Sequence, residues 1–73
     1  MSSITMYTLK YWSDDERRNM GESDIYGSFD DLDNAKLYAR KLVDNGIAVC
    51  AEVIAHENDE EELLFGCDNE NEW

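Results

Sequence analysis

The chain has 73 residues, and 18 Asp and Glu against 6 Lys and Arg give it a formal net charge of -12. This length allows one domain with a thin core. Hydrophobic residues make up 42% of the chain, which is enough to fold and argues against a wholly disordered protein. The charge argues against nucleic acid and anionic membranes as partners, because both are negative, and favours a basic protein surface.

The N-terminus lacks a basic region followed by an apolar run, so no signal peptide is predicted. No stretch approaches the length of a membrane span. Two cysteines, Cys50 and Cys67, are too few for a disulfide framework. We therefore expect a cytoplasmic protein, in which free thiols are favoured over a disulfide.

Residues 4–12, ITMYTLKYW, are rich in β-branched and aromatic types and predict a strand. One face of this strand would carry Tyr7, Leu9 and Tyr11. The other would carry Ile4, Met6 and Trp12, and the pattern leaves open which face is buried. Residues 13–23, SDDERRNMGES, are polar and indicate a loop, and residues 24–29, DIYGSF, predict a second short strand.

A helix is predicted from Leu32, with Asp30 or Asp31 as its N-cap and with Asp31 and Asp33 at the positive end of its dipole. Asn45 and Gly46 supply a left-handed stop. Helical spacing of apolar side chains gives the buried stripe, which consists of Leu32, Ala35, Ala39, Leu42 and Val43.

Residues 47–56 and 61–67 predict two further strands around a turn at Asn58 and Asp59. The pattern β-β-α-β-β is typical of an α+β domain with one helix on a mostly antiparallel four-stranded sheet. We expect this domain to span residues 1–67, and residues 68–73 to form a frayed, acidic C-terminal tail.

The turn also predicts a register for the last hairpin. His56 would oppose Glu61, and Ile54 would oppose Leu63. Cys50 would oppose Cys67. The face assigned to the core carries Ile47, Val49, Ala51, Val53, Ala55 and Leu64. The opposite face carries Cys50, Ile54, Leu63 and Phe65 and has no evident cover, so we expect N-terminal aromatics, a second subunit or a partner to meet it.

The acids fall into two groups along the sequence. The first consists of Asp14, Asp15, Glu16, Glu22, Asp24, Asp30, Asp31 and Asp33. The second follows Asp44, after which no Lys or Arg occurs, and its hairpin tip carries Glu57, Asp59, Glu60, Glu61 and Glu62. Carboxylates two residues apart on a strand lie roughly 6.6 Å apart, which suits a mimic of successive phosphates. The alternative is a solvated face that only keeps the protein soluble.

Few residues of this sequence are candidates for metal binding or catalysis. The acidic segments lack the spacing of an EF-hand loop, although weak Ca²⁺ binding stays open. His56 is the only histidine, which argues against a zinc site. No Gly-rich phosphate loop or nucleophile–base arrangement is present. We expect no catalytic residues, no metal site, no cofactor and no enzyme activity.

In size, acid excess, lack of enzyme motifs and β-β-α-β-β pattern, the chain resembles the small acidic inhibitors encoded by phages. These include anti-CRISPR and anti-restriction proteins, several of which mimic DNA. The resemblance covers nearly the whole chain and carries no residue roles with it. It implies an inhibitor that acts in the host cytoplasm on the basic nucleic-acid-binding surface of a nuclease or CRISPR effector subunit.

The residue types predict which surface contacts the basic partner. Acidic side chains would meet the basic partner, and an aromatic side chain beside them would anchor the interface. The expected partner-binding residues are Trp12, Asp14, Asp15, Asp30, Asp31, Asp33, Glu57, Asp59, Glu60, Glu61 and Glu62. The alternative function is a small protein–protein interaction module or homodimer, which would use the face of Ile54, Leu63 and Phe65, with acidity only for solubility.

Overall fold

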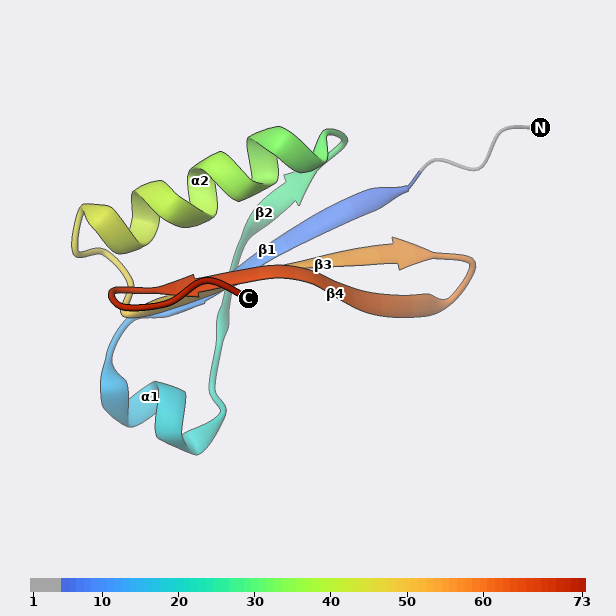
Figure 1. Cartoon of the computed structure of the whole chain (residues 1–73). Helices are drawn as coiled ribbons and strands as arrows, with labels where there is room; N and C mark the ends of the chain where they lie inside the picture. The colour runs from blue at the N-terminus through green and yellow to red at the C-terminus, as the bar shows by residue number, and fades with distance from the viewer. Residues whose placement is uncertain (1–4) are drawn as a thin grey trace.

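A computed structural model describes residues 5–73 of the chain. Its elements are β1 (Met6–Trp12), α1 (Asp15–Met20), β2 (Asp24–Phe29), α2 (Leu32–Asp44), β3 (Cys50–Glu57) and β4 (Glu60–Asp68) (Figure 1). The strands form one antiparallel sheet in the order β2-β1-β3-β4. The expected α+β class is confirmed. Ile4, placed on the first strand, lies outside the described residues.

A helix, α1, occupies the segment predicted as a loop, so the element order is β-α-β-α-β-β and the loop prediction was wrong. The Asp14 side chain accepts a hydrogen bond from the Arg17 amide at 2.7 Å and caps the N-terminus of α1. Gly21 ends the helix at φ 74°. None of the six residues of α1 is buried, so no apolar period revealed it.

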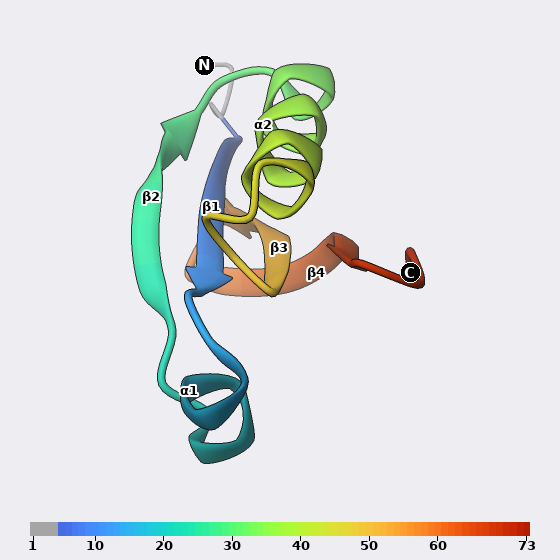
Figure 2. The same ribbon diagram turned by 90° about the vertical axis from the view of Figure 1, so that its left-hand side faces the viewer.

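The core lies between α2 and one face of the sheet. Figure 2 shows α2 against one side of the twisted sheet, with α1 beyond the end of β1. Leu9, Val53 and Cys67 are the largest fully buried side chains. The predicted helical stripe is confirmed, because Ala35, Ala39, Leu42 and Val43 are buried in α2 and Leu32 packs against them. Tyr7, Leu9 and Tyr11 form the face of β1 that meets this core.

The β3–β4 hairpin has the predicted turn at Asn58 and Asp59. Its strand register matches the prediction as far as Ile54 and differs from it beyond that residue. Asn58 and Asp59 have φ of 50° and 68°, as a two-residue hairpin turn requires. His56 opposes Glu61 and Ile54 opposes Leu63, as predicted. A bulge then shifts the register between Val53 and Ile54.

Beyond this bulge, the inserted residue turns the following side chains of β4 to the other face. Phe65 opposes Val53, and Cys67 opposes Ala51. Phe65 therefore packs against the core rather than on the open face, and that assignment was wrong. Cys50 opposes Asp68 and not Cys67, and both cysteines are free.

Three residues assigned to the core face, Ile47, Val49 and Leu64, lie elsewhere. Val49 lines a hollow beside Asp15 and Arg18. Ile47 is 54% exposed, because β3 begins only at Cys50 and residues 47–49 connect it to α2. The amides of Ile47 and Ala48 donate to the Leu42 carbonyl, which completes the end of the helix. Leu64, at the bulge, is 36% exposed.

The C-terminal residues are not frayed, so that expectation was wrong. Gly66 and Trp73 exchange backbone hydrogen bonds of 2.7 and 2.8 Å, and an antiparallel bridge joins Cys67 to Glu72. The turn between them is closed by the Asp68 carboxylate, which accepts from the amides of Glu70 and Asn71. The end of the chain thus runs back along β4 as a short added strand.

Candidate functional site

The hairpin tip and the start of α2 border the same end of the sheet. Phe29, Tyr7, Ala55 and Glu62 form one row across the strands. Asp30 follows Phe29 directly. Because neighbouring strands lie about 4.8 Å apart, the ends of this row are roughly 14 Å apart. We call this surface the acidic end, which consists of Asp30, Asp31, Asp33, Glu57, Asp59, Glu60, Glu61 and Glu62.

Carboxylates of the acidic end are exposed and nearly unpaired. Within residues 5–73, their one ion pair joins His56 Nδ1 to Glu61 Oε1 at 3.4 Å, and no Lys or Arg comes within ion-pair distance of them. Asp31 has a local structural role, since its side chain accepts from the Asp33 amide at 3.0 Å and caps α2. The positive N-terminus of α2 faces these aspartates and offsets part of their repulsion.

The arginines lie at the other end of the molecule and are all paired with acids. Arg17 contacts Asp24 at 3.5 Å, and Arg18 contacts Asp68 at 3.2 Å. Arg40 contacts Asp44 at 2.9 Å. The three arginines thus form their ion pairs far from the hairpin tip, and none of them neutralises a carboxylate of the acidic end.

Three of the expected contact residues lie at this second end. The register pairs Met6 with His56 near the acidic end and Trp12 with Cys50 at the opposite end of β1. Six residues of extended strand separate these rows by roughly 20 Å. Asp14 and Asp15 follow Trp12 into α1. The structure therefore places Asp30, Asp31 and Asp33 at the same end of the sheet as the hairpin acids, although on the opposite edge, and leaves Trp12, Asp14 and Asp15 at the other end.

Trp12 is part of the packing around α1. Its ring lies 5.9 Å from Lys10 Nζ, and its indole nitrogen is buried without a hydrogen-bond partner in the described part of the chain. Trp73 and Arg18 line the same small hollow. A Trp held in this way covers the sheet beside α1 and is poorly placed to anchor a partner at the hairpin.

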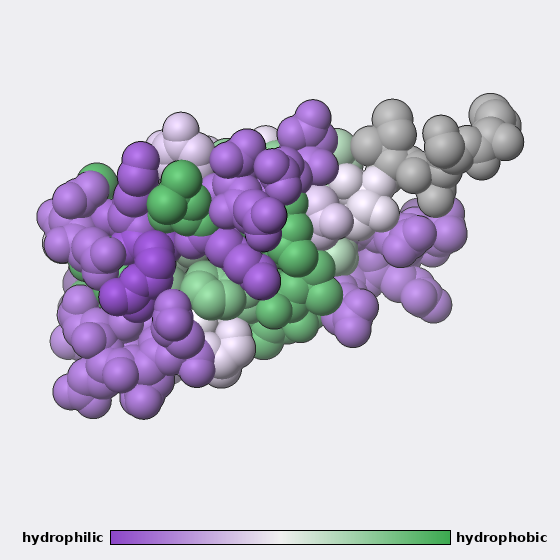
Figure 3. All heavy atoms as spheres, turned by 45° about the horizontal axis from the view of Figure 1, so that its top comes forward, coloured by the Kyte–Doolittle hydropathy of each residue, from purple (hydrophilic) through white to green (hydrophobic). Residues whose placement is uncertain are grey.

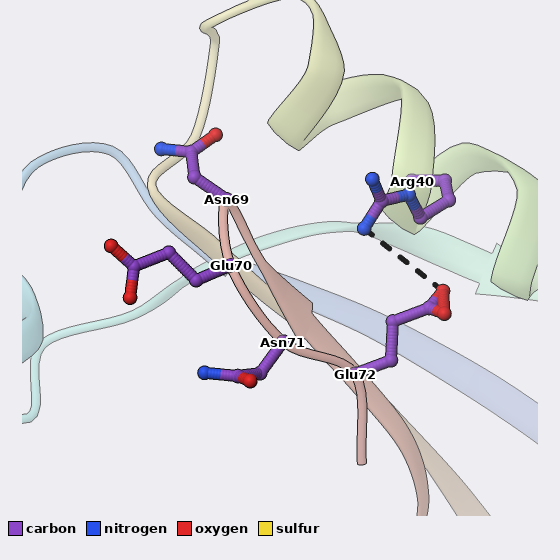
Figure 4. Close-up of a pocket in the computed structure, with 5 residues that line it drawn as sticks. All are labelled: Arg40, Asn69, Glu70, Asn71 and Glu72. Carbon is purple, nitrogen blue, oxygen red and sulfur yellow. Dashed lines mark ion pairs between the residues drawn. The ribbon is translucent and has the colours of Figure 1, made fainter.

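The C-terminal turn forms an open hollow with Arg40, but its side chains do not converge (Figure 4). Glu72 points toward Arg40, and their charged groups are 4.0 Å apart. Glu70 and Asn71 point away from this pair in Figure 4. The arrangement is that of a surface ion pair beside a turn, which contributes little on its own.

Residues 5–73 contain no group of three or more His, Cys, Asp or Glu side chains placed to hold a metal ion. Over the same range, no helix combines the length and the apolar character that crossing a membrane requires. Burial raises the pKa of both the Cys50 and the Cys67 thiol. Because the thiolate is the reactive form, neither cysteine is set up as a nucleophile.

Within residues 5–73, the sheet face that turns away from α2 is covered at its α1 end, where Trp12, Arg18 and Trp73 lie over it. Near the hairpin it forms a hollow, lined by Thr8, Lys10, Ile25, Ser28, Ile54, His56 and Glu61. Ile25 is 63% exposed, and Leu63 beside the hollow is 49% exposed. The sequence predicted Ile54 and Leu63 here but not Thr8 and Ile25, because it left open which face of residues 4–12 is buried and assigned no face to residues 24–29.

Comparison with known proteins produced no match: no family model, no curated protein and no solved structure corresponds to this chain. The functional proposal is therefore based on the chain's own residues, and its strongest feature is the segregation of acids from arginines.

Proposed function

We propose that this chain is an inhibitor that binds the basic nucleic-acid-binding surface of a nuclease or CRISPR effector, in the host cytoplasm, and blocks DNA or RNA by charge mimicry. The supporting observation is that the acidic end has no Lys or Arg ion pair within residues 5–73, whereas Arg17, Arg18 and Arg40 all pair with acids elsewhere. Unrelieved self-repulsion costs stability, so this distribution is explained better by binding than by folding.

The geometry of the acidic end suits a groove that accepts a nucleic-acid strand. Glu60 and Glu62 are alternate residues of β4, so their carboxylates project from one face roughly 6.6 Å apart. The aspartates at the start of α2 add a second acidic row roughly 14 Å away across the sheet. The two-residue turn and the helix cap fix both rows before binding, which lowers the entropic cost of association.

Binding of this kind has a defined dependence on salt. Opposite charges steer the two proteins together and raise the association rate. A basic groove that accepts the acidic end also gives up the counterions and water that otherwise screen it. Affinity should therefore fall steeply as ionic strength rises, as it does when the same groove binds nucleic acid.

The proposal is tested with two variants that remove the same number of charges from opposite ends. Glu57, Glu60, Glu61 and Glu62 become Gln in the first variant. Asp15, Glu16, Glu22 and Glu70, whose side chains form no ion pair in residues 5–73, become their amides in the second. A protein retained from a bacterial lysate at low salt is purified, and its nucleic-acid binding is titrated with each variant.

We expect the native chain and the second variant to displace nucleic acid, and the first variant to lose affinity by about 100-fold or more, since several charge-assisted contacts disappear together. Equal losses in the two variants would mean that net charge alone acts. Tight binding that leaves nucleic-acid binding by the partner intact would overturn the proposal.

A second candidate function is a homodimer or interaction module that uses the open sheet face. The observation in its favour is the exposure of Ile25 and Leu63 around the hollow that Ile54 lines. Phe65 does not belong to this surface. Two copies of charge -12 repel each other, so this dimer would strengthen as salt rises. Sedimentation at low and high salt thus separates the two candidates, because their salt dependences are opposite.

A further inference from the structure

We propose that the free edge of β4, at Glu61 and Leu63, receives an extended Lys- or Arg-bearing segment of the partner as an added strand. This inference rests on the proposed function and specifies how the basic partner is held. It differs from charge mimicry alone, because it requires a backbone of defined shape on the partner.

The hairpin register determines which backbone groups of β4 point outward. A two-residue turn is closed by a hydrogen-bonded pair, here Glu57 and Glu60. Pairs then alternate along an antiparallel ladder, so the pairs of Glu61 and Leu63 are not hydrogen-bonded to β3. The N–H and C=O of Glu61 and Leu63 therefore point away from the sheet. In residues 5–73, no backbone bond reaches them from outside the hairpin.

The same edge already accepts an added strand at its other end. Both the N–H and the C=O of Gly66 point outward and bond Trp73 of the C-terminal segment. Burial along β4 follows this coverage: residues 60–64 are exposed, whereas Gly66 and Cys67, beside the C-terminal segment, are buried. Strand addition to this edge is thus a contact that the chain itself makes, and it stops short of the hairpin tip.

Side chains along the free edge specify the occupant. Glu60, Glu61 and Glu62 would lie beside the added strand, where opposite charges stabilise a cross-strand pair and like charges destabilise it. A second copy of β4 is disfavoured for this reason, and a strand with Lys or Arg is favoured. Leu63 and Leu64 follow, at 49% and 36% exposure.

Apolar surface continues beside the acidic residues. Figure 3 shows hydrophobic atoms gathered between the hydrophilic side chains of α2 and those of the hairpin tip. An extended segment that carries both basic and apolar residues could pair with the carboxylates and pack against the leucines. Its backbone would bond the outward N–H and C=O groups of β4. Strand addition of this kind draws its affinity from main-chain hydrogen bonds and its specificity from side chains.

The test uses a short peptide that alternates lysine and valine, together with the same peptide N-methylated on the residues whose amides would bond β4. Both peptides carry the same charge, but the methylated one cannot donate those hydrogen bonds. Binding is measured at low salt, and hydrogen exchange of the Glu61 and Leu63 amides is followed in the native chain. We expect the unmethylated peptide to slow this exchange by at least about ten-fold and the methylated peptide to leave it unchanged.

Two variants of the chain provide the matched control. Leu63→Pro removes an outward N–H while keeping the charge, as proline is tolerated on a strand edge, whereas Leu63→Ala keeps the N–H. We expect the proline variant, with its fold checked by circular dichroism, to bind the peptide about ten-fold or more weakly than the alanine variant. Equal affinities for the two peptides, with both amides unprotected, would overturn strand addition and leave charge mimicry standing. Failure of both peptides to bind would count against the proposed function as well.

Discussion

Trp73 donates a hydrogen bond from its indole nitrogen to the carboxylate of Glu52 at 3.3 Å, across the strand that separates them. The ring lies on Gly66, where a Cβ would collide with its atoms. Glycine at this position therefore allows the C-terminal segment to lie flat on the sheet. The backbone bonds between Gly66 and Trp73 pair this part of the β4 edge, and in residues 5–73 the part near the hairpin stays unpaired.

Gly66→Ala should displace the Trp73 ring and destabilise the protein by about 1–3 kcal/mol, because the added methyl overpacks this contact. Thermal unfolding and the shift of tryptophan fluorescence toward that of a solvated indole measure the effect. Gly27→Ala is the matched control, since nothing lies within 4 Å of a Cβ at that strand position. The prediction fails if the two variants unfold at the same temperature.

Asp31→Ala should lower the stability by about 1 kcal/mol, since it removes the side chain that caps α2. Asp30→Ala loses the same charge one residue earlier without losing a cap, so it should change stability much less. Chemical denaturation of the two variants gives the difference directly. Similar midpoints would mean that charge near the helix, and not the cap, matters here.

Hydrogen bonds from the Asn71 and Glu70 amides, together with Arg18, lower the pKa of Asp68 from its ordinary value of 3.8. A lowered pKa means that the folded state favours the carboxylate. The stabilisation is therefore present above about pH 3.8 and is lost as the pH falls through the lowered pKa. Asp68→Asn should be less stable than the native chain at pH 7, and the difference should disappear in acid.

Glu22→Gln is the control for this pH dependence, because its side chain forms no ion pair in residues 5–73. Urea unfolding at pH 7, 5 and 3 should show a nearly constant difference between this variant and the native chain. A difference for Asp68→Asn that stays the same at all three pH values would show that the Asp68 charge does not stabilise the turn.

Much of the fold follows from local patterns in the sequence. The spacing from Leu32 to Val43, the Asp31 cap and the Asn58–Asp59 turn each specify a local structure, and each prediction was confirmed. The errors have non-local causes. Leu64 enters the ladder as an extra residue, and this bulge moves Phe65 to the other face. No pattern of alternation along β4 alone contains that information.

The acidic end was predictable only in part. Charge counts along the sequence grouped Asp14 and Asp15 with the aspartates at Asp30, because the grouping followed nearness in the sequence and ignored that the strand at 24–29 separates its two ends in space. The structure places Trp12, Asp14 and Asp15 beyond one end of the sheet and the hairpin beyond the other. The free edge of β4 could not be predicted, because it depends on where the C-terminal segment pairs.

Glu57 and Glu60 face each other directly across the hairpin, where like charges are destabilising. Glu60→Lys should convert this repulsion into an attractive pair and raise the stability of the free protein by about 0.2–1 kcal/mol. The same change places a cation in the acidic end and should weaken binding to the basic partner. Opposite effects on stability and binding are characteristic of a functional surface.

Glu61→Gln is the companion variant, because it removes the carboxylate that pairs with His56 without placing a cation at the tip. It should weaken binding less than Glu60→Lys and should not stabilise the fold. Unfolding midpoints and partner titrations at one salt concentration test both variants together. If Glu60→Lys stabilises the fold and binds the partner as tightly as the native chain, then the hairpin tip does not form the contact, since a cation could not be tolerated within a basic groove.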